Sequence, residues 1–326
     1  MGRYLVTGGA GYIGSHMVLA LADRGDEVVV FDNLLLGHRE AVPAGVKLVV
    51  ADLADAAAVD ATLRDGKWDA VLHFASLSQV GESMRQPFEY LLKNGVNGIK
   101  LIEACVKFGV PKFVLSSTAA LFAEPDEIPI PETATIRPGS PYGESKHILE
   151  NTLLWAGRIY GLKSARIRYF NAAGADALGR AGEDHRPESH LIPLAIDAAL
   201  GNAPPLTVFG TDYPTPDGTC IRDYVHVTDV ADAHLRALDQ LGDRSVVYNL
   251  GNGQGHSVLQ VLQSIERVSG LKVPHSIGPR RAGDPAVLVA SSAKLRAETG
   301  WNPKFADLDA IVATALAWRR EHPKGY

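Results

Sequence analysis

The stretch that decides the fold is RYLVTGGAGYIGSH, residues 3–16, near the start of the chain. A short apolar run ends at Thr7, a glycine-rich turn follows, and apolar residues then recur at helical spacing. Gly8, Gly11 and Gly14 have the spacing G-x-x-G-x-x-G, a relative of the dinucleotide-binding fingerprint. Such glycines let the backbone turn sharply, approach a pyrophosphate closely, and pack a helix against the strand with its N–H groups aimed at the anion. The stretch therefore predicts a strand, a phosphate-binding turn and a helix.

The next apolar run, residues 28–31, ends in a carboxylate, Asp32. An acid at this position suits a ribose 2′-hydroxyl and repels a 2′-phosphate. The expected cofactor is therefore NAD rather than NADP.

Composition excludes several classes of function. A chain of 326 residues with 46% hydrophobic and 21% charged residues can fold as one large or two medium domains. The net charge of −5, without a Lys/Arg run, argues against nucleic-acid binding. Cys105 and Cys220 are too few for a disulfide framework or, without other ligands, a metal site, so no metal is expected. Without a signal sequence or a run of ~20 apolar residues, no membrane association and a cytoplasmic location are expected.

Strand and helix patterns alternate through the first half of the chain. Short, almost continuous apolar runs are typical of strands buried on both faces of a parallel sheet; they cover residues 47–50, 70–73, 112–115 and 165–169. A long helical pattern begins at Pro87 and ends before Gly109. The fold class predicted is α/β, a doubly wound parallel sheet (Rossmann-like) with a smaller C-terminal α/β substrate domain.

The expected domain boundaries are 1–170 for the NAD-binding part and 171–326 for the substrate-binding part. Parts of 221–251 are expected to complete the first sheet, because residues 248–251 read as a further strand. Ligands bind outside the carboxyl ends of such strands. Those ends supply Asp52 and Leu53, then Phe74 and Ala75, and then the hydroxyl cluster Ser116, Ser117 and Thr118. An alternative role for the two serines is to cap the following loop or helix.

Tyr142 and Lys146 are four residues apart in a predicted helix that opens at Ser140, so they project from one face. An ammonium ~5 Å from a phenol, at an effective dielectric of about 20, favours the phenolate by roughly 3 kcal/mol. Lone Tyr-x-x-x-Lys pairs are usually structural, but this pair follows a dinucleotide fingerprint and a hydroxyl cluster. Tyr142 is therefore the candidate base.

Together these motifs resemble the extended short-chain dehydrogenase/reductase superfamily and, within it, the family of UDP-glucose (UDP-galactose) 4-epimerases. The resemblance covers essentially the whole chain. Its marks are VTGGAGYIGSH (6–16), FDNL (31–34), HFA (73–75), VGES (80–83), SST (116–118), SPYGESK (140–146), RYFN (168–171), FGTDYPTPDGTCIRDYVHV (209–227), YNLG (248–251) and PRRAGD (279–284).

The resemblance implies a role for each candidate residue. Tyr142 is the base, Lys146 holds the cofactor ribose and lowers the pKa of Tyr142, and Thr118 hydrogen-bonds the sugar O4. Contacts with NAD are implied for Gly8, Gly11, Tyr12, Ile13, Gly14, Asp32, Asn33, Asp52, Leu53, Phe74, Ala75, Ser116, Tyr142, Lys146 and Phe170. Contacts with the UDP-sugar are implied for Thr118, Tyr142, Asn171, His190, Leu191, Phe209, Arg222, Tyr224, Arg281, Asp284 and Leu288.

The implied reaction is transient oxidation of the sugar at C4, rotation of the 4-keto sugar, and return of the hydride to the opposite face, with no net redox change. Members of the family are commonly dimers, which implies a homodimer through helices near 88–108 and 143–158.

Four departures from the family pattern bear on the site. Ser78 replaces a common lysine, and Phe122-Ala123 replaces Tyr-Gly. Asn94-Gly95 replaces a double asparagine with one residue inserted nearby, so neither residue is assigned to the site. Leu288 replaces a tyrosine that commonly closes the sugar pocket, so turnover of UDP-GlcNAc beside UDP-glucose and UDP-galactose is expected.

Three alternatives are weighed. Dehydratases and decarboxylases carry an acid just after the Ser/Thr, whereas Ala119 and Ala120 follow Thr118 here, which disfavours both. A 4-epimerase acting on UDP-GlcNAc, UDP-xylose/arabinose or UDP-glucuronate remains open. A non-catalytic NAD(H)-binding regulator would have no need of the Thr118, Tyr142 and Lys146 set.

Overall fold

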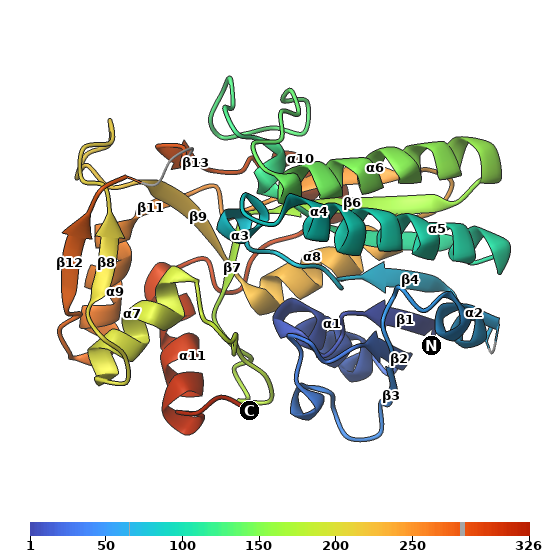
Figure 1. The fold of residues 1–326 in the computed structure, drawn as a ribbon, viewed down its shortest axis with the longest axis horizontal. Coiled ribbons are helices and arrows are strands. Elements are labelled where there is room, and N and C mark those ends of the chain that lie inside the picture. Colours follow the sequence, from blue (N-terminus) through green and yellow to red (C-terminus); the bar gives the residue numbers. More distant parts are fainter. Residues whose placement is uncertain (65, 281–283) are drawn as a thin grey trace.

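The computed structural model describes residues 1–64, 66–280 and 284–326. Its centre is a seven-stranded sheet in the order β10-β6-β5-β4-β1-β2-β3, in which every neighbouring pair is parallel (Figure 1). The strands are β1 (Arg3–Thr7), β2 (Glu27–Asp32), β3 (Lys47–Val50), β4 (Ala70–His73), β5 (Lys112–Thr118), β6 (Lys163–Tyr169) and β10 (Val246–Leu250). The predicted doubly wound parallel sheet is confirmed, and its strand order reverses between β1 and β4.

Helices cover both faces of this sheet. One apolar core packs α1 (Tyr12–Asp23), α8 (Val227–Asp239) and α10 (Ala293–Thr299) against one face. A second core packs α2 (Ala56–Arg64), α5 (Asn97–Lys107) and α6 (Pro141–Tyr160) against the other face. The start of α6 is fixed locally, because Ser140 Oγ accepts the Gly143 N–H and Pro141 occupies the first turn.

The segment from Pro87 to Lys107 differs from the single α-helix that its periodicity predicts. It consists of α4 (Pro87–Tyr90), the π-helical turn η2 (Leu91–Val96) and α5. A π turn accommodates one extra residue without breaking the helix. This explains how the apparent insertion beside Asn94 and Gly95 fits between well-packed neighbours.

The second part of the molecule has its own core, in which α7 (Leu191–Leu200), α9 (Val258–Ser269) and α11 (Leu308–Glu321) pack together. Its larger sheet contains β11 (Gly255–Ser257), β9 (Ile221–His226), β13 (Val287–Leu288) and β7 (Asn171–Ala173), and its smaller one pairs β8 (Leu206–Phe209) with β12 (His275–Gly278). Within 221–251, β10 therefore belongs to the seven-stranded sheet, and β9 belongs to this second part. The remaining short elements are α3 (Val80–Ser83), η1 (Arg39–Ala41) and η3 (Ala119–Leu121).

No helix in the described ranges has the length and apolar character needed to cross a bilayer.

Candidate active site

A cavity lies at the carboxyl ends of β1, β2 and β4, where the strand order reverses and where ligands of such sheets bind. Eight predicted cofactor residues line it: Gly8, Gly11, Asp32, Asn33, Asp52, Leu53, Phe74 and Ala75. Tyr12, Ile13 and Gly14 form the first turn of α1 directly after it. The structure therefore brings the glycine turn, the acid after β2 and the end of β4 to one place.

The glycine turn fits a dinucleotide pyrophosphate. Gly8 has a φ of 74°, and a Cβ added there would lie 2.3 Å from the Ala75 nitrogen. A Cβ on Gly14 would lie 2.0 Å from the Gly8 oxygen, so this glycine permits close packing of helix on strand. A Cβ on Gly11 would approach only the Gly8 oxygen, at 3.4 Å. The backbone at Gly11 is thus open to an approaching anion, as the fingerprint requires.

Asp32 is buried and held by two backbone donors. Its Oδ2 accepts the Ala10 N–H at 3.0 Å and its Oδ1 accepts the Leu34 N–H at 2.9 Å. Burial raises the pKa of this carboxyl, and the two hydrogen bonds partly offset that effect. Asn33 donates to Asp52 Oδ2 at 2.7 Å, which joins a candidate ribose contact to a residue predicted to line the cofactor. These carboxylates suit the hydroxyls of an adenosine ribose.

Thr118, Tyr142 and Lys146 are buried together where β5 ends and α6 begins. The Lys146 ammonium donates to the Ser116 carbonyl oxygen at 3.0 Å, and burial lowers the pKa of Lys146 to about 7. Burial raises the pKa of Tyr142, while a hydrogen bond with Thr118 acts in the opposite direction. Tyr90 packs edge-on against the Tyr142 ring, with centroids 6.4 Å apart.

The expected lowering of the Tyr142 pKa by Lys146 stays a prediction. The net direction for Tyr142 is upward, because desolvation of the phenolate outweighs the Thr118 hydrogen bond. The Lys146 ammonium donates to a carbonyl of β5.

The hydroxyl cluster forms the end of β5 rather than a loop after it, because β5 continues to pair with β6 as far as Thr118 and Tyr169. Ser116 shares a hydrogen bond of 2.6 Å with the Tyr169 hydroxyl. Ser117 donates to Glu150 Oε1 at 2.6 Å, and this glutamate is paired through both oxygens with Arg168. Ser117 therefore supports a buried ion pair behind the site.

The candidate substrate residues converge from several loops and strands. Asn171 of β7 pairs with Tyr224 of β9, and Leu288 of β13 pairs with Arg222 of β9. Arg222 donates to Asp284 at 2.6 Å. His190 and Leu191 lie at the start of α7 and Phe209 ends β8. Arg281 lies outside the described residues.

Leu288 shares an apolar cluster with Phe170, the residue predicted to face the nicotinamide. Both contact a small buried cluster formed by Leu121, Phe122 and Ile130. Phe122 belongs to this cluster and Leu288 packs against it, so two departures from the family pattern lie in the same apolar region.

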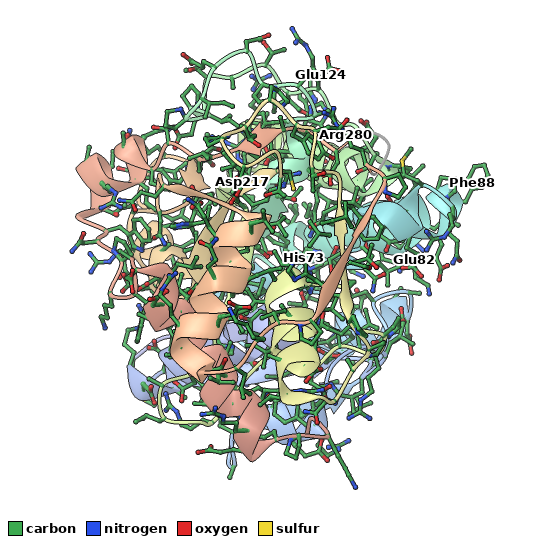
Figure 2. The ribbon with its side chains drawn as sticks, turned by 90° about the vertical axis from the view of Figure 1, so that its left-hand side faces the viewer. His73, Glu82, Phe88, Glu124, Asp217 and Arg280 are labelled. Carbon is green, nitrogen blue, oxygen red and sulfur yellow. The ribbon has the colours of Figure 1, made fainter. Side chains whose placement is uncertain are left out.

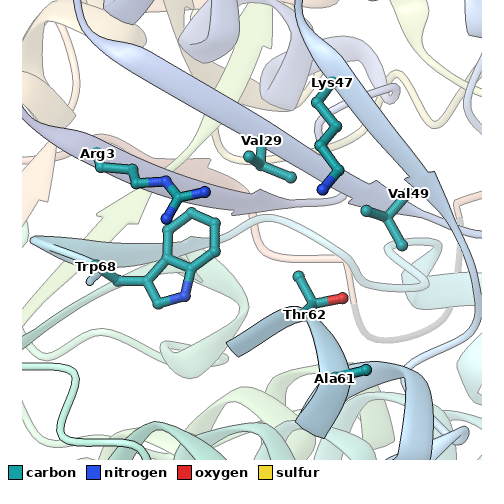
Figure 3. A pocket seen from close by; sticks show the side chains of 7 residues that line it. All are labelled: Arg3, Val29, Lys47, Val49, Ala61, Thr62 and Trp68. Carbon is teal, nitrogen blue, oxygen red and sulfur yellow. The ribbon is translucent and has the colours of Figure 1, made fainter. Parts of the chain in front are cut away.

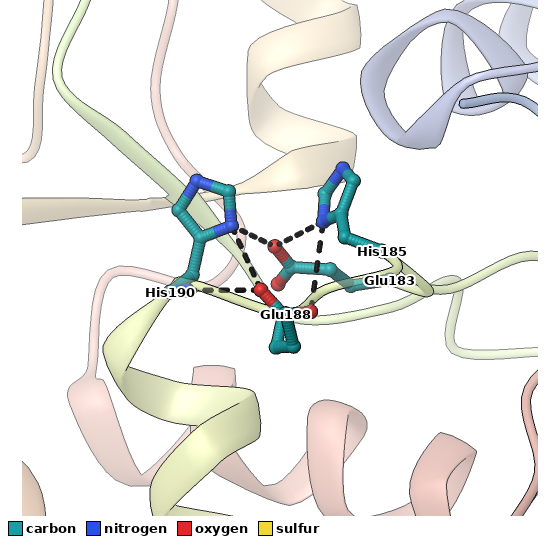
Figure 4. A group of neighbouring side chains, drawn as sticks. All are labelled: Glu183, His185, Glu188 and His190. Carbon is teal, nitrogen blue, oxygen red and sulfur yellow. Dashed lines mark hydrogen bonds and ion pairs between the residues drawn. The ribbon is translucent and has the colours of Figure 1, made fainter. Parts of the chain in front are cut away.

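A further polar group lies in the loop before α7. Glu183, His185, Glu188 and His190 face one another, as Figure 4 shows. Burial lowers the pKa of both histidines, but the two carboxylates outweigh it, so the pKa of His185 is about 9 and that of His190 about 10. His185 also packs edge-on against Tyr12 of the glycine turn, with centroids 6.1 Å apart.

A second hollow lies away from the candidate site. Figure 3 shows Arg3, Lys47 and Trp68 around it, with Thr62 and Ala61 of α2 below. Arg3 and Lys47 are the first residues of β1 and β3, so this hollow lies at the amino ends of the strands. Ligands of doubly wound sheets bind at the carboxyl ends of the strands, which is the opposite edge of the sheet. We therefore assign no cofactor role to this second hollow.

Comparison with known proteins identifies the family. Residues 4–251 match the NAD dependent epimerase/dehydratase family. The chain is 50% identical over 326 residues to UDP-glucose 4-epimerase of Streptococcus mutans, covering 99% of this chain and 98% of that protein. This chain belongs to the UDP-glucose 4-epimerase family.

Solved structures of epimerases agree over the same length. One crystal structure of a UDP-glucose 4-epimerase matches with a TM-score of 0.97 and 45% identity, covering 99% of each chain. The enzyme of Bifidobacterium longum, solved with NAD⁺ and UDP, matches with a TM-score of 0.95 and 34% identity, covering 99% of this chain and all of that chain.

The structure adds Asn94 to the predicted residues of this epimerase-family site. Asn94 lines the cofactor cavity from the π turn, together with Lys93. Its side chain accepts the Leu77 N–H and donates to the Leu77 carbonyl oxygen, both at 2.9 Å. The signal that could have identified Asn94 is a polar residue at a buried helical position. The local insertion obscured this signal because it disturbs the helical spacing.

Proposed function

We propose that this protein interconverts UDP-glucose and UDP-galactose by reversible oxidation at C4 of the sugar. The observation that carries the proposal is that Thr118, Tyr142 and Lys146 are buried together in the same sheet-and-helix layer as a cavity lined by the glycine turn and Asp32. Membership of the epimerase family supports the same reaction.

Tyr142 takes the proton from the sugar O4, and Thr118 hydrogen-bonds that oxygen and keeps it in line with the phenol. NAD⁺, when bound, would supply the hydride acceptor and donor for C4 and a positive charge near Tyr142. Lys146 holds the cofactor ribose with its ammonium, which the Ser116 carbonyl already orients. Tyr142 then returns its proton to O4, so atoms and electrons balance with no net redox change.

The UDP group is held, in this proposal, by the second part of the molecule. Arg222 forms an ion pair with Asp284. When UDP binds, the Arg222 guanidinium contacts the diphosphate as well as Asp284. The supporting residues are Asn171, His190, Leu191, Phe209, Tyr224, Arg281 and Asp284. This division corresponds to a cofactor domain, 1–170, and a UDP-sugar domain, 171–326, with β10 of the latter range completing the large sheet.

The preferred sugar is tested by a panel of UDP-glucose, UDP-GlcNAc, UDP-xylose and UDP-glucuronate, each followed for its C4 epimer. The proposal expects the highest kcat/KM with UDP-glucose. A higher value for UDP-xylose or UDP-glucuronate would reassign the substrate within the same reaction class.

A homodimer is part of the proposal. Large apolar side chains are exposed on the packed pair of helical segments α4–η2 and α6, including Phe88 (78% exposed), Leu92 (58%), Trp155 (59%) and Ile159 (63%). Figure 2 shows Phe88 at the outer edge of the molecule. A patch of this kind favours a protein interface. Light scattering should give twice the chain mass and, for a double variant Phe88→Asp/Trp155→Asp, the mass of one chain. A cytoplasmic location is proposed alongside; the free, buried thiol of Cys105 is consistent with it.

A further inference from the structure

The loop between β7 and α7 folds four potential metal ligands into one compact group. His190 Nδ1 lies 2.8 Å from Glu183 Oε1 and 3.1 Å from Glu188 Oε1. His185 Nδ1 lies 3.3 Å from Glu183 Oε1 and 3.6 Å from Glu188 Oε2. Nitrogen and oxygen donors therefore alternate around a ring, and all of these ligand atoms lie within 4.8 Å of one another (Figure 4).

We propose that Glu183, His185, Glu188 and His190 bind one divalent transition-metal ion, with Zn²⁺ the best match. A tetrahedral zinc site with bonds of about 2.0–2.2 Å separates neighbouring ligand atoms by about 3.3–3.5 Å. The nitrogen–oxygen separations here, 2.8–3.6 Å with both oxygens of Glu188 included, bracket that value. Two imidazoles with two carboxylates form a donor set suited to zinc.

An independent observation also points to a cation. The Glu183 side chain is only 9% exposed, and its Oε1 faces the Nδ1 atoms of His185 and His190 at ion-pair distance without a hydrogen bond of normal geometry within the described ranges. His185 Nδ1, aimed at the same point, is also buried without a well-formed hydrogen bond among those residues. Buried polar atoms are rarely left in this state. An ion at the centre of the ring would satisfy both atoms.

The site is reachable from solvent and lies next to the cofactor turn. The His190 side chain is 47% exposed and leaves an entry path, whereas Glu183 closes the inner side. Figure 4 shows the second ring nitrogen of His190 directed away from the group, so metal binding through Nδ1 leaves that nitrogen for the substrate. Since His185 packs on Tyr12, the ion would fasten the loop before α7 beside the glycine turn.

The test uses the full-length protein after treatment with a chelator, titrated with Zn²⁺ by calorimetry and with Co²⁺ by absorption. Wild type should bind one ion and show the intense visible absorption of four-coordinate Co²⁺. His185→Asn and Glu183→Gln should each weaken binding at least a hundredfold, whereas His275→Asn, on the exposed strand β12, should leave it unchanged.

Nuclear magnetic resonance of wild type with Co²⁺ gives a readout that needs no variant. Two histidine rings should show paramagnetically shifted protons. No binding by wild type, fewer than two shifted rings, or binding by both variants as tight as by wild type (an adventitious ion only) would overturn the proposal. Because metal binding is measured without turnover, failure of the epimerase proposal would leave this result standing.

Discussion

Tyr142 presents the main chemical difficulty at the scale of single residues. Burial raises the pKa of its phenol above the ordinary value, whereas burial lowers the pKa of Lys146 to about 7. Both shifts favour neutral groups, because a low-dielectric site penalises charge. A cationic cofactor bound beside Tyr142 would favour the phenolate, so we expect proton transfer to depend on cofactor occupancy.

Replacement of Tyr142 by phenylalanine removes the hydroxyl group that acts as the base and keeps the aromatic ring. In Tyr142→Phe, kcat should fall by about 10²–10⁴-fold with KM for UDP-galactose nearly unchanged, because the lost interaction forms with the reacting proton. Steady-state kinetics measures both constants. Tyr160→Phe, at the exposed end of the same helix, is the matched control and should keep wild-type values. Turnover near wild type in Tyr142→Phe would assign the base elsewhere.

Leu288 determines, in our account, the breadth of sugar recognition. Leu288 and Phe170 pack against the cluster that contains Phe122, so we expect the room that a tyrosine ring would fill at position 288 to be open to the sugar. Wild type should turn over UDP-GlcNAc weakly beside UDP-glucose, since such pocket differences are worth only ~1–3 kcal/mol.

Leu288→Tyr should remove the UDP-GlcNAc activity and retain that with UDP-glucose, and Leu288→Met should retain both. Product ratios for the two substrates, measured for each protein, check this. Persistence of UDP-GlcNAc turnover in Leu288→Tyr would show that another residue limits the pocket.

At the scale of elements, local patterns predict the sheet well because each strand is a short apolar run bounded by turn residues. The glycine turn, β2 with Asp32, and α6 with its Ser140 cap follow directly from such patterns. The π turn could not be predicted, because one inserted residue disturbs helical spacing without a breaker to mark it. The Glu183–His190 group was also missed, because its ring depends on the path of a loop that no periodicity reports.

Asn94 tests the importance of that π turn. Asn94→Ala leaves the Leu77 N–H and carbonyl without their buried partner, which costs about 1–3 kcal/mol, and should loosen the cavity wall. The variant should lower both the melting temperature and the fraction of NAD retained on purification. Asn151→Ala, exposed on α6, is the control. Full NAD retention in Asn94→Ala would show that the π turn does not shape the cofactor site.

At the scale of the whole molecule, the core buries several neutral histidines. Burial lowers the pKa of His16 and His234 to about 4 and that of His73 and His226 to about 3. The unfolded chain binds these protons near pH 6.5, so stability falls as pH decreases below that value, by up to about 1.4 kcal/mol per histidine and pH unit. Asp223 has the opposite effect on stability. Burial raises its pKa to about 6, so near pH 5 the folded protein holds about one more proton on this carboxyl than the unfolded chain does.

The free energy of unfolding should therefore decrease between pH 6.5 and pH 5 with a net slope of about three protons. His185 and His190, whose raised pKa values lie above this window, contribute a constant amount within it. Urea titrations across the window measure the slope, and His234→Gln should reduce it by about one proton. A flat or rising profile would contradict the assignment of these histidines as buried and neutral.

The central claim is that hydride leaves C4 and returns to the same sugar, with proton transfer by Tyr142. The most direct measurement is conversion of UDP-galactose carrying deuterium at C4, followed by nuclear magnetic resonance of the product. We expect UDP-glucose that keeps its deuterium at C4, with no accumulation of an oxidised sugar. Release of the label to solvent, or failure of the NAD-loaded protein to convert the substrate, would contradict the account.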